Sequence, residues 1–303
     1  MKKFVVGTND ASQRLDKFLS KLLRNAPMGM IYKWIRKKRV KVNGKKQEIS
    51  YFLCEGDILE LYINDEFFAE QAPLPLHLKD AVELDVVYED KNILIVNKPS
   101  GLVAHSDGKG GKNLLNMIQA YLYRKGEYLP EVENSFAPSL CNRIDRNTAG
   151  LVIAAKNAEA LREINKKIRN REINKYYLLH VEKLPEKRSG KIEGYIIKKE
   201  SENKVCFYRE KREGTKHCVT LYRVLNDEGL VEVQLETGRT HQIRASFAAI
   251  GCPLKGDVKY GASKDGKRDF QALTAYKIEF DFDNDEGVLG YLKGKTVCID
   301  EQR

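Results

Sequence analysis

Residues 142–153 read NRIDRNTAGLVI: a carboxylate between two arginines, a turn of small residues, and then an apolar run. The apolar run predicts a buried strand over residues 150–156, so Asp145 lies just before that strand. An aspartate at such a place is most often a turn residue or a structural ion-pair partner. Its neighbours Arg143 and Arg146 suggest a second interpretation.

That second interpretation is a permanently charged carboxylate at a functional site. The later stretch ETGRTHQIR supplies two further cations, Arg239 and Arg244. An opposite charge within ~4–6 Å lowers the pKa of a carboxyl group by about 1–3 units. Such an ionised group is a poor general acid, and it suits nucleophilic attack or electrostatic stabilisation of a transition state. We therefore treat Asp145 as a candidate catalytic residue.

Positive charge is concentrated at the start of the chain. Residues 1–62 hold 14 lysines and arginines against six aspartates and glutamates, whereas the rest of the 303 residues hold 39 against 37. This asymmetry indicates a polyanionic partner. No apolar stretch approaches ~18 residues, and the N-terminus carries no signal-peptide core, so we expect a soluble, cytoplasmic protein without a membrane contact.

Cysteine and histidine spacing gives no sign of a metal site or a disulfide framework, because neither type occurs in closely spaced pairs. We therefore expect free thiols in a reducing compartment, no metal and no other cofactor. The six cysteines and five histidines are Cys54, Cys141, Cys206, Cys218, Cys252, Cys298, His77, His105, His180, His217 and His241.

The first segment has the pattern of a small independent module. Leu15, Phe18, Leu19 and Leu22 form one face of an amphipathic helix, and IYKWIRKKR predicts a second, basic helix. The stretch VKVNG then predicts a strand and a hairpin turn. We place a domain at residues 1–63, a proline-spaced linker at 64–83 and a second domain at 84–303. In the second domain predicted strands outnumber helices and often follow one another directly, which favours an α+β fold with a mixed, mostly antiparallel central sheet and flanking helices.

Two familiar catalytic patterns are missing from the sequence. The glycine-rich stretch 108–113 fails the G-x-x-x-x-G-K-[ST] spacing of a phosphate-binding loop, so we expect no nucleotide cofactor. No G-x-S-x-G elbow of a serine hydrolase occurs either.

Four motifs in the order expected of one family resemble the RluA-type RNA pseudouridine synthases. NRIDRNTAGLVI is similar to H-R-[LI]-D-x-x-T-[SA]-G-[LI], and KYYLLHV is similar to K-x-Y-x-x-x-V. EDKNILIVNKPSGLVAH resembles the first motif of the family, and residues 235–261 resemble L-x-T-G-R-T-H-Q-I-R through G-D-x-x-Y-G. Departures such as Asn142 for histidine and Thr274 for histidine leave the aspartate untouched. The basic N-terminal module, residues 1–63, resembles the small αL RNA-binding domain first seen in a small-subunit ribosomal protein, through the stretches 14–19 and 40–44.

The resemblance implies a role for each matching residue. Asp145 falls on the catalytic aspartate, Tyr177 on the active-site tyrosine that stacks on the target base, and Arg244 on the arginine that pairs with the carboxylate. Arg143 would hold the flipped-out nucleotide, and Arg239 and His241 would position substrate. Lys98 and Pro99 match the first motif as scaffold. In the N-terminal domain, the RNA-binding candidates are Lys33, Arg36, Lys37, Lys38 and Arg39.

The resemblance implies an isomerase that converts uridine to pseudouridine in large-subunit ribosomal RNA, acts as a monomer and needs no cofactor. The target base must leave its stack to reach a buried aspartate, and contacts to phosphates offset this cost. Two alternatives stay open: a synthase for transfer RNA or for several RNA classes, and a catalytically silent RNA-binding assembly factor. Attack of Asp145 on the base or on the sugar also stays open.

Overall fold

The computed structural model describes residues 1–68, 74–106, 108, 111–199, 204–264, 270–284 and 286–299. Part of the predicted linker (69–73), part of the glycine-rich loop (107, 109 and 110) and the end of the predicted second domain (300–303) lie outside the described residues. None of the helices in the described ranges is long and apolar enough to span a bilayer.

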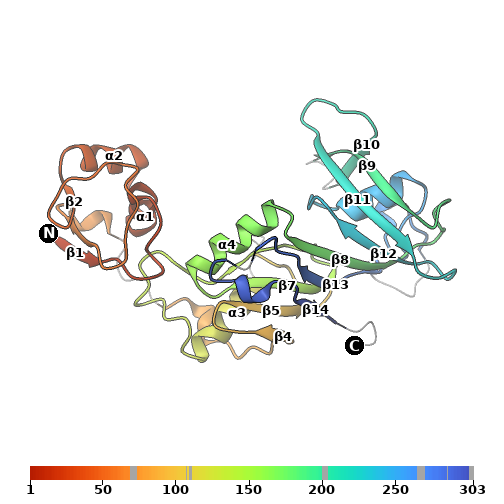
Figure 1. Cartoon of the computed structure of the whole chain (residues 1–303), viewed down its shortest axis with the longest axis horizontal. Coiled ribbons are helices and arrows are strands. Elements are labelled where there is room, and N and C mark those ends of the chain that lie inside the picture. The colour runs from red at the N-terminus through yellow and green to blue at the C-terminus, as the bar shows by residue number, and fades with distance from the viewer. Residues whose placement is uncertain are drawn as a thin grey trace. The chain divides into compact units, whose positions relative to one another are not determined.

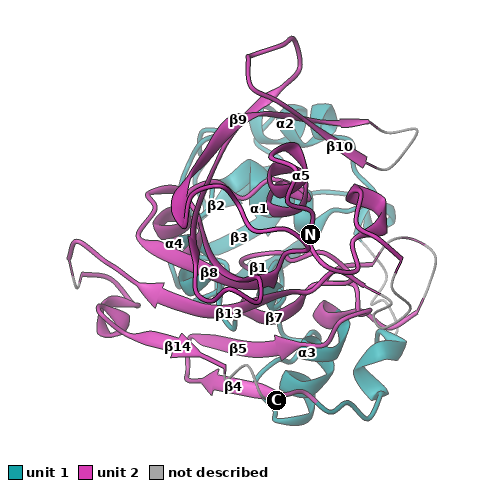
Figure 2. Ribbon diagram, turned by 90° about the vertical axis from the view of Figure 1, so that its right-hand side faces the viewer, with its two compact units in different colours: residues 1–83, 116–139, 155–162 teal, residues 84–115, 140–154, 163–303 magenta. Residues whose placement is uncertain are grey.

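The chain forms two compact units, which are coloured in Figure 2. The first unit comprises residues 1–83, 116–139 and 155–162, and the second comprises residues 84–115, 140–154 and 163–303. The units therefore combine segments that are separated in the sequence. The domain boundaries given above stay a prediction.

Figure 1 labels the elements in chain order. The α-helices are α1 (Leu15–Leu22), α2 (Met28–Arg36), α3 (Leu114–Arg124), α4 (Ala158–Arg169) and α5 (Gln242–Ala249). The strands are β1 (Lys2–Val5), β2 (Val40–Val42), β3 (Ile58–Leu61), β4 (Val86–Glu89), β5 (Ile93–Lys98), β6 (Ser139–Leu140), β7 (Ala149–Ala155), β8 (Ile173–His180), β9 (Ser189–Lys199), β10 (Lys204–Tyr208), β11 (Lys216–Val224), β12 (Leu230–Leu235), β13 (Leu273–Phe280) and β14 (Thr296–Cys298). Short 3₁₀ helices include η1 (Asp65–Phe67), η2 (Leu76–Lys79), η4 (Val258–Tyr260) and η5 (Gly290–Leu292).

The N-terminal module, residues 1–63, has the helices and strands that its sequence pattern predicts. The apolar faces of α1 and α2 are buried with β2 and β3 in one core that includes Phe18 and Trp34. The three strands form an antiparallel sheet in the order β1-β3-β2. Helix α2 ends in a Schellman motif, in which Arg39 N–H donates to the Trp34 carbonyl and Lys38 takes a left-handed conformation with φ of 60°.

The second unit is organised by an eleven-stranded sheet. Its strand order is β10-β9-β11-β12-β8-β13-β7-β5-β4, with β14 paired to β13 and β6 paired to β7. The pairs from β10 to β13 along this order are antiparallel, whereas β13 and β7 are parallel. Helix α5 packs on the part of the sheet formed by β9, β10 and β11. The α+β fold with a mixed, mostly antiparallel sheet and flanking helices is confirmed.

Strand β13 lies between the two strands that matter most for the site. Ala275 of β13 is in register with Gly150 of β7 on one side and with Tyr177 of β8 on the other. The approach to β7 is so close that a Cβ atom on Gly150 would lie 2.1 Å from the Ala275 carbonyl oxygen. Gly150 also has φ of 114°, which side chains disfavour. The glycine after the Asp145 turn therefore permits this pairing of strands.

Candidate active site

Asp145 lies in the loop between β6 and β7, and the backbone of this loop is firmly held. Thr148 N–H donates to the Asp145 carbonyl over 3.1 Å and closes a turn. At the start of the loop, the Asn142 side chain accepts a hydrogen bond from Ile153 N–H of β7 over 2.7 Å. The hydrogen bonds of Asn142 and Thr148 thus fix the position of the Asp145 backbone relative to β7.

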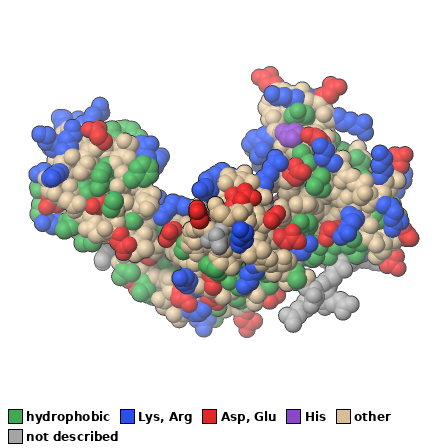
Figure 3. Space-filling model, in the orientation of Figure 1, with side chains coloured by type: hydrophobic (Ala, Val, Ile, Leu, Met, Phe, Trp, Pro, Cys, Tyr) green, Lys and Arg blue, Asp and Glu red, His purple; other side chains and the backbone are tan. Residues whose placement is uncertain are grey.

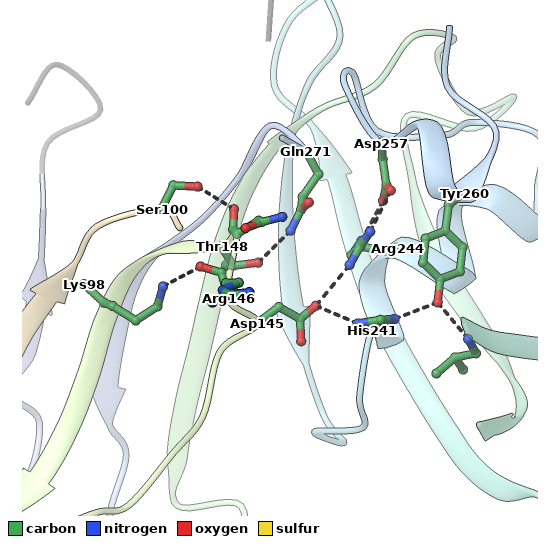
Figure 4. A network of polar contacts seen from close by, with 12 residues as sticks. Lys98, Ser100, Asp145, Arg146, Thr148, His241, Arg244, Asp257, Tyr260 and Gln271 are labelled. Atoms are coloured by element: carbon green, nitrogen blue, oxygen red, sulfur yellow. Dashed lines mark hydrogen bonds and ion pairs between the residues drawn. The ribbon is translucent and has the colours of Figure 1, made fainter. Parts of the chain in front are cut away.

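The end of β5 anchors the same loop from the other side. Lys98 is fully buried, and its Nζ donates to three carbonyls, those of Pro99, Leu102 and Arg146, over 2.8–2.9 Å. Ser100 Oγ donates to the Asn147 carbonyl over 2.9 Å. Burial lowers the pKa of Lys98 to about 8, while the charge of Asp145 acts in the opposite direction. Figure 4 shows Lys98 and Ser100 bonded to the segment that carries Asp145.

The Asp145 carboxylate is one-quarter exposed and meets two side chains from the start of α5. Its Oδ2 lies 3.6 Å from Arg244 Nη1 and 3.8 Å from His241 Nε2. Both distances exceed a hydrogen bond, so these are ion-pair and dipole contacts. Both contacts involve the same carboxylate oxygen, Oδ2.

Arg244 is itself fixed by a second carboxylate, that of Asp257. Its Nε and Nη2 donate to the two oxygens of Asp257, each over 2.7 Å, in a bidentate pair that is buried. Burial alone would lower the pKa of Arg244, but the hydrogen bonds and charge of Asp257, with the charge of Asp145, raise it. Arg244 therefore presents a permanent positive charge to Asp145.

His241 precedes α5 in a left-handed backbone conformation, with φ of 50° and ψ of 21°. Its Nδ1 lies 2.8 Å from the hydroxyl of Tyr260, which also accepts Val205 N–H over 2.9 Å. Burial, helped by the charge of Arg244, lowers the pKa of His241 despite the opposing charge of Asp145. Its surroundings therefore favour the neutral form of the ring.

Tyr177 lies on β8, is buried, and faces the same pocket as Asp145. Burial raises the pKa of Tyr177 well above its ordinary value, and the charge of Asp145 raises it further. Tyr177 is therefore a neutral phenol at pH 7, suited to packing against a base.

These side chains surround one pocket of about 940 Å³, whose walls come entirely from the second unit. Six residues expected at the site line it: Arg143, Asp145, Tyr177, Arg239, His241 and Arg244. A volume of this size accommodates a nucleotide-sized ligand.

The cations that meet the Asp145 carboxylate differ from those that its sequence neighbours suggest. Arg143 and Arg146 are exposed, and the side chains within ion-pair distance of Asp145 in the described part of the chain are Arg244 and His241. Successive residues of a turn project in different directions, so neighbouring charges in the sequence need not meet. Arg143 still lines the pocket, where a bound anion could reach it.

Sequence reasoning missed Asp257, Tyr260 and Lys175. The first two lie in the G-D-x-x-Y-G stretch, and their spacing of three residues was the available signal. Lys175 lines the pocket two residues before Tyr177, and alternation along β8 places both on one face. Burial lowers the pKa of Lys175, and across the described ranges no carboxylate forms an ion pair with it.

The five RNA-binding candidates in the N-terminal module are all exposed. Lys33 and Arg36 lie on the outer side of α2, and Lys37, Lys38 and Arg39 follow it in the Schellman turn. Figure 3 shows lysine and arginine side chains gathered over this helix. These five residues are called the basic patch below.

Comparisons with known proteins agree with this geometry. A family model described as RNA pseudouridylate synthase matches residues 92–249, and one described as S4 domain matches residues 13–59. An RNA pseudouridine synthase of Mycoplasma capricolum is 36% identical over 98% of this chain and 97% of its own length. A protein named ribosomal large subunit pseudouridine synthase C, from Vibrio cholerae, is 33% identical over 88% of this chain and 80% of its own.

Among solved structures, human RNA pseudouridylate synthase domain containing 1 is similar in fold. Its TM-score is 0.55 at 23% identity, and the match covers 72% of this chain and 84% of that one.

Proposed function

The chain belongs to the RNA pseudouridylate synthase family and is an enzyme that isomerises uridine in RNA to pseudouridine; we propose that Asp145 is its nucleophile and that large-subunit ribosomal RNA is its substrate. The observation that carries the assignment of Asp145 is its carboxylate, held beside Arg244 and His241 in the pocket that Tyr177 lines.

The reaction breaks the bond between ribose and the uracil nitrogen N1, turns the base and rejoins it through ring carbon five. Carbon five then loses its proton to a base, and N1 gains a proton, so that the product is an isomer of uridine. An ionised Asp145 would act by adding to the uracil ring or by attacking the anomeric carbon of the sugar. Arg244 would orient the carboxylate, because Asp257 prevents its guanidinium from moving away. Tyr177 would stack on the flipped-out base, and its raised pKa argues against a phenolate base in the free enzyme at pH 7.

The assignment of large-subunit RNA is supported by two findings. The Vibrio cholerae relative is named for the large ribosomal subunit. The S4 domain match covers α1, α2, β2 and the start of β3 in a module that carries the basic patch. Contacts from such a patch to phosphates would offset the few kcal/mol that unstacking the target nucleotide costs. Arg143 and Arg239 would hold that nucleotide at the pocket.

Release of tritium from ring carbon five of uridine in ribosomal RNA tests the nucleophile. We expect turnover by the wild type and none by Asp145→Ala or Asp145→Asn. Asp227→Asn is a matched control, because Asp227 forms an exposed ion pair with Arg188. Turnover that survives in Asp145→Ala would contradict the assignment.

Mapping pseudouridines in cells with and without the protein tests the substrate. Sites lost only from large-subunit ribosomal RNA support the proposal. Sites lost from transfer RNA would overturn it in favour of the alternative specificity.

A further inference from the structure

The geometry points to His241 and Tyr260 as a positioning relay that orients the Asp145 carboxylate through its oxygen Oδ2. This inference rests on Asp145 being the nucleophile proposed above. From the sequence, His241 is expected to position the substrate. The structure instead places the His241 ring beside the Asp145 carboxylate, so we assign it to positioning the nucleophile.

The direction of each hydrogen bond follows from the first member of the relay. Val205 N–H of β10 donates to Tyr260 Oη over 2.9 Å, which occupies a lone pair of the hydroxyl. Burial raises the pKa of Tyr260 to about 12, so the hydroxyl keeps its hydrogen. That hydrogen is free to be donated to His241 Nδ1, 2.8 Å away.

When Tyr260 donates this hydrogen, the tautomer of His241 follows. Nδ1 accepts the bond from Tyr260, so the single proton of the neutral ring resides on Nε2. Nε2 is the atom that faces Asp145 Oδ2, at 3.8 Å. The opposite tautomer would place a lone pair against the carboxylate, which is electrostatically unfavourable. Figure 4 shows the relay from Tyr260 through His241 to Asp145.

The backbone of His241 is held in a conformation that few residues other than glycine adopt. Its left-handed φ and ψ direct the ring toward Asp145 from the residue before α5. The next residue, Gln242, secures this bend by accepting bonds from Thr237 Oγ1 and Arg239 N–H and donating to the Val219 carbonyl. Strain kept in place by such a network is typical of functional sites.

The two side chains that contact Asp145, those of Arg244 and His241, differ in how far they can move toward it. Arg244 is held by two short bonds to Asp257, so its guanidinium cannot approach Asp145 without breaking them. His241 has no such bidentate anchor, so a small movement of its ring would shorten its 3.8 Å separation from Asp145 to a hydrogen bond. The charged groups that act on its ring are Asp145, Arg244, Asp257 and Lys259, and the net effect with burial is a lowered pKa. This lowered pKa favours the neutral form of the ring, which can donate one hydrogen bond.

The tautomer can be read directly by long-range proton–nitrogen correlation NMR of the full-length protein with nitrogen-15-labelled histidine at a pH of about 7.5, above the ordinary pKa of histidine. The His241 signals are those that disappear in His241→Asn. We expect a protonated Nε2 and an unprotonated Nδ1. A proton on Nδ1 would overturn the relay, whatever the activity of the protein.

Kinetics of two substitutions separate positioning from a merely structural role. His241→Asn suits the left-handed backbone and can still bond Tyr260, but no atom reaches Asp145. We expect its kcat to fall about 10²-fold with KM for RNA unchanged. His241→Gln restores a donor near the position of Nε2 and should recover part of kcat. Equal loss in both variants, or a change in KM alone, would refute the relay. The assignment of Asp145 as nucleophile is tested separately: turnover in Asp145→Ala would contradict that assignment without bearing on the relay.

Discussion

Asp257 binds Arg244 through two hydrogen bonds of 2.7 Å, which are shorter than the 3.6 Å separation between Arg244 and Asp145. Asp257, which does not line the pocket, therefore holds the guanidinium through Nε and Nη2. Only the remaining nitrogen, Nη1, faces Asp145 in the pocket. This division leaves Asp145 partly exposed beside a guanidinium that is held in place by another carboxylate.

The first prediction concerns Asp257. Asp257→Asn leaves a buried guanidinium without its counter-charge, and we expect the free energy of unfolding to fall by about 3 kcal/mol. Turnover should fall as well, because Arg244 is no longer held in place. Urea denaturation and tritium release measure the two effects. In Asp227→Asn, which breaks an exposed pair, stability should change by less than about 1 kcal/mol. Equal stability of both variants would contradict this account.

Gly150→Ala should disrupt the sheet beside Asp145. The added Cβ would collide with the Ala275 backbone, and φ of 114° is unfavourable for alanine, so a destabilisation of several kcal/mol is expected. Thermal denaturation provides the measurement. Gly29→Ala is the matched control, because Gly29 lies in α2 and a methyl group added there would have no atom within 4 Å. This control should stabilise the module by about 0.5–1 kcal/mol.

Lys175→Met tests whether this lysine binds RNA. Lys175 is half-buried, and its ammonium, which has no carboxylate partner among the described residues, would find its counter-charge in a phosphate of the RNA. We expect weaker RNA binding and a salt dependence reduced by about one phosphate contact. Because burial lowers the pKa of Lys175, wild-type affinity should fall as pH rises through that lowered value, and the variant should lack this fall. Fluorescence anisotropy measures RNA binding by the wild type and the variant. Unchanged affinity and an unchanged salt slope would exclude a contact between Lys175 and a phosphate.

The basic patch should govern affinity without affecting chemistry. Replacing Lys37 and Arg39 together by alanine should weaken RNA binding and lower the salt slope by about one for each phosphate that is no longer neutralised. At saturating RNA, kcat should be unchanged, since the pocket belongs to the second unit. Lys2→Ala is a control in the same module, because Lys2 already pairs with Asp65. A fall in kcat with unchanged affinity would contradict this division of roles.

The sequence predicted those features that depend on local patterns. The buried faces of α1 and α2 follow from apolar spacing, and the residues that line the pocket were found through motifs that place each in a recognisable stretch. Alternation along β8 could also have revealed Lys175 beside Tyr177.

Features that depend on packing between distant segments could not be predicted in this way. The pairing of Arg244 with Asp257 requires η4 to pack on α5, and the hydrogen bond between His241 and Tyr260 requires the same arrangement. Nothing in the sequence near Asp145 indicates that its cationic partner would be Arg244 and not Arg143. Charges that are adjacent in the chain were a poor guide, because side chains of a turn diverge.

The place of β13 has a consequence for synthesis of the protein. Ala275 pairs with Gly150 and Tyr177 at once, so the strand that follows the Asp145 loop and the strand that carries the aromatic ring are aligned by a strand that is synthesised after both. A nascent polypeptide that still lacks β13 lacks the strand that lies between these two. Assembly of the active site must therefore wait until β13 has been synthesised.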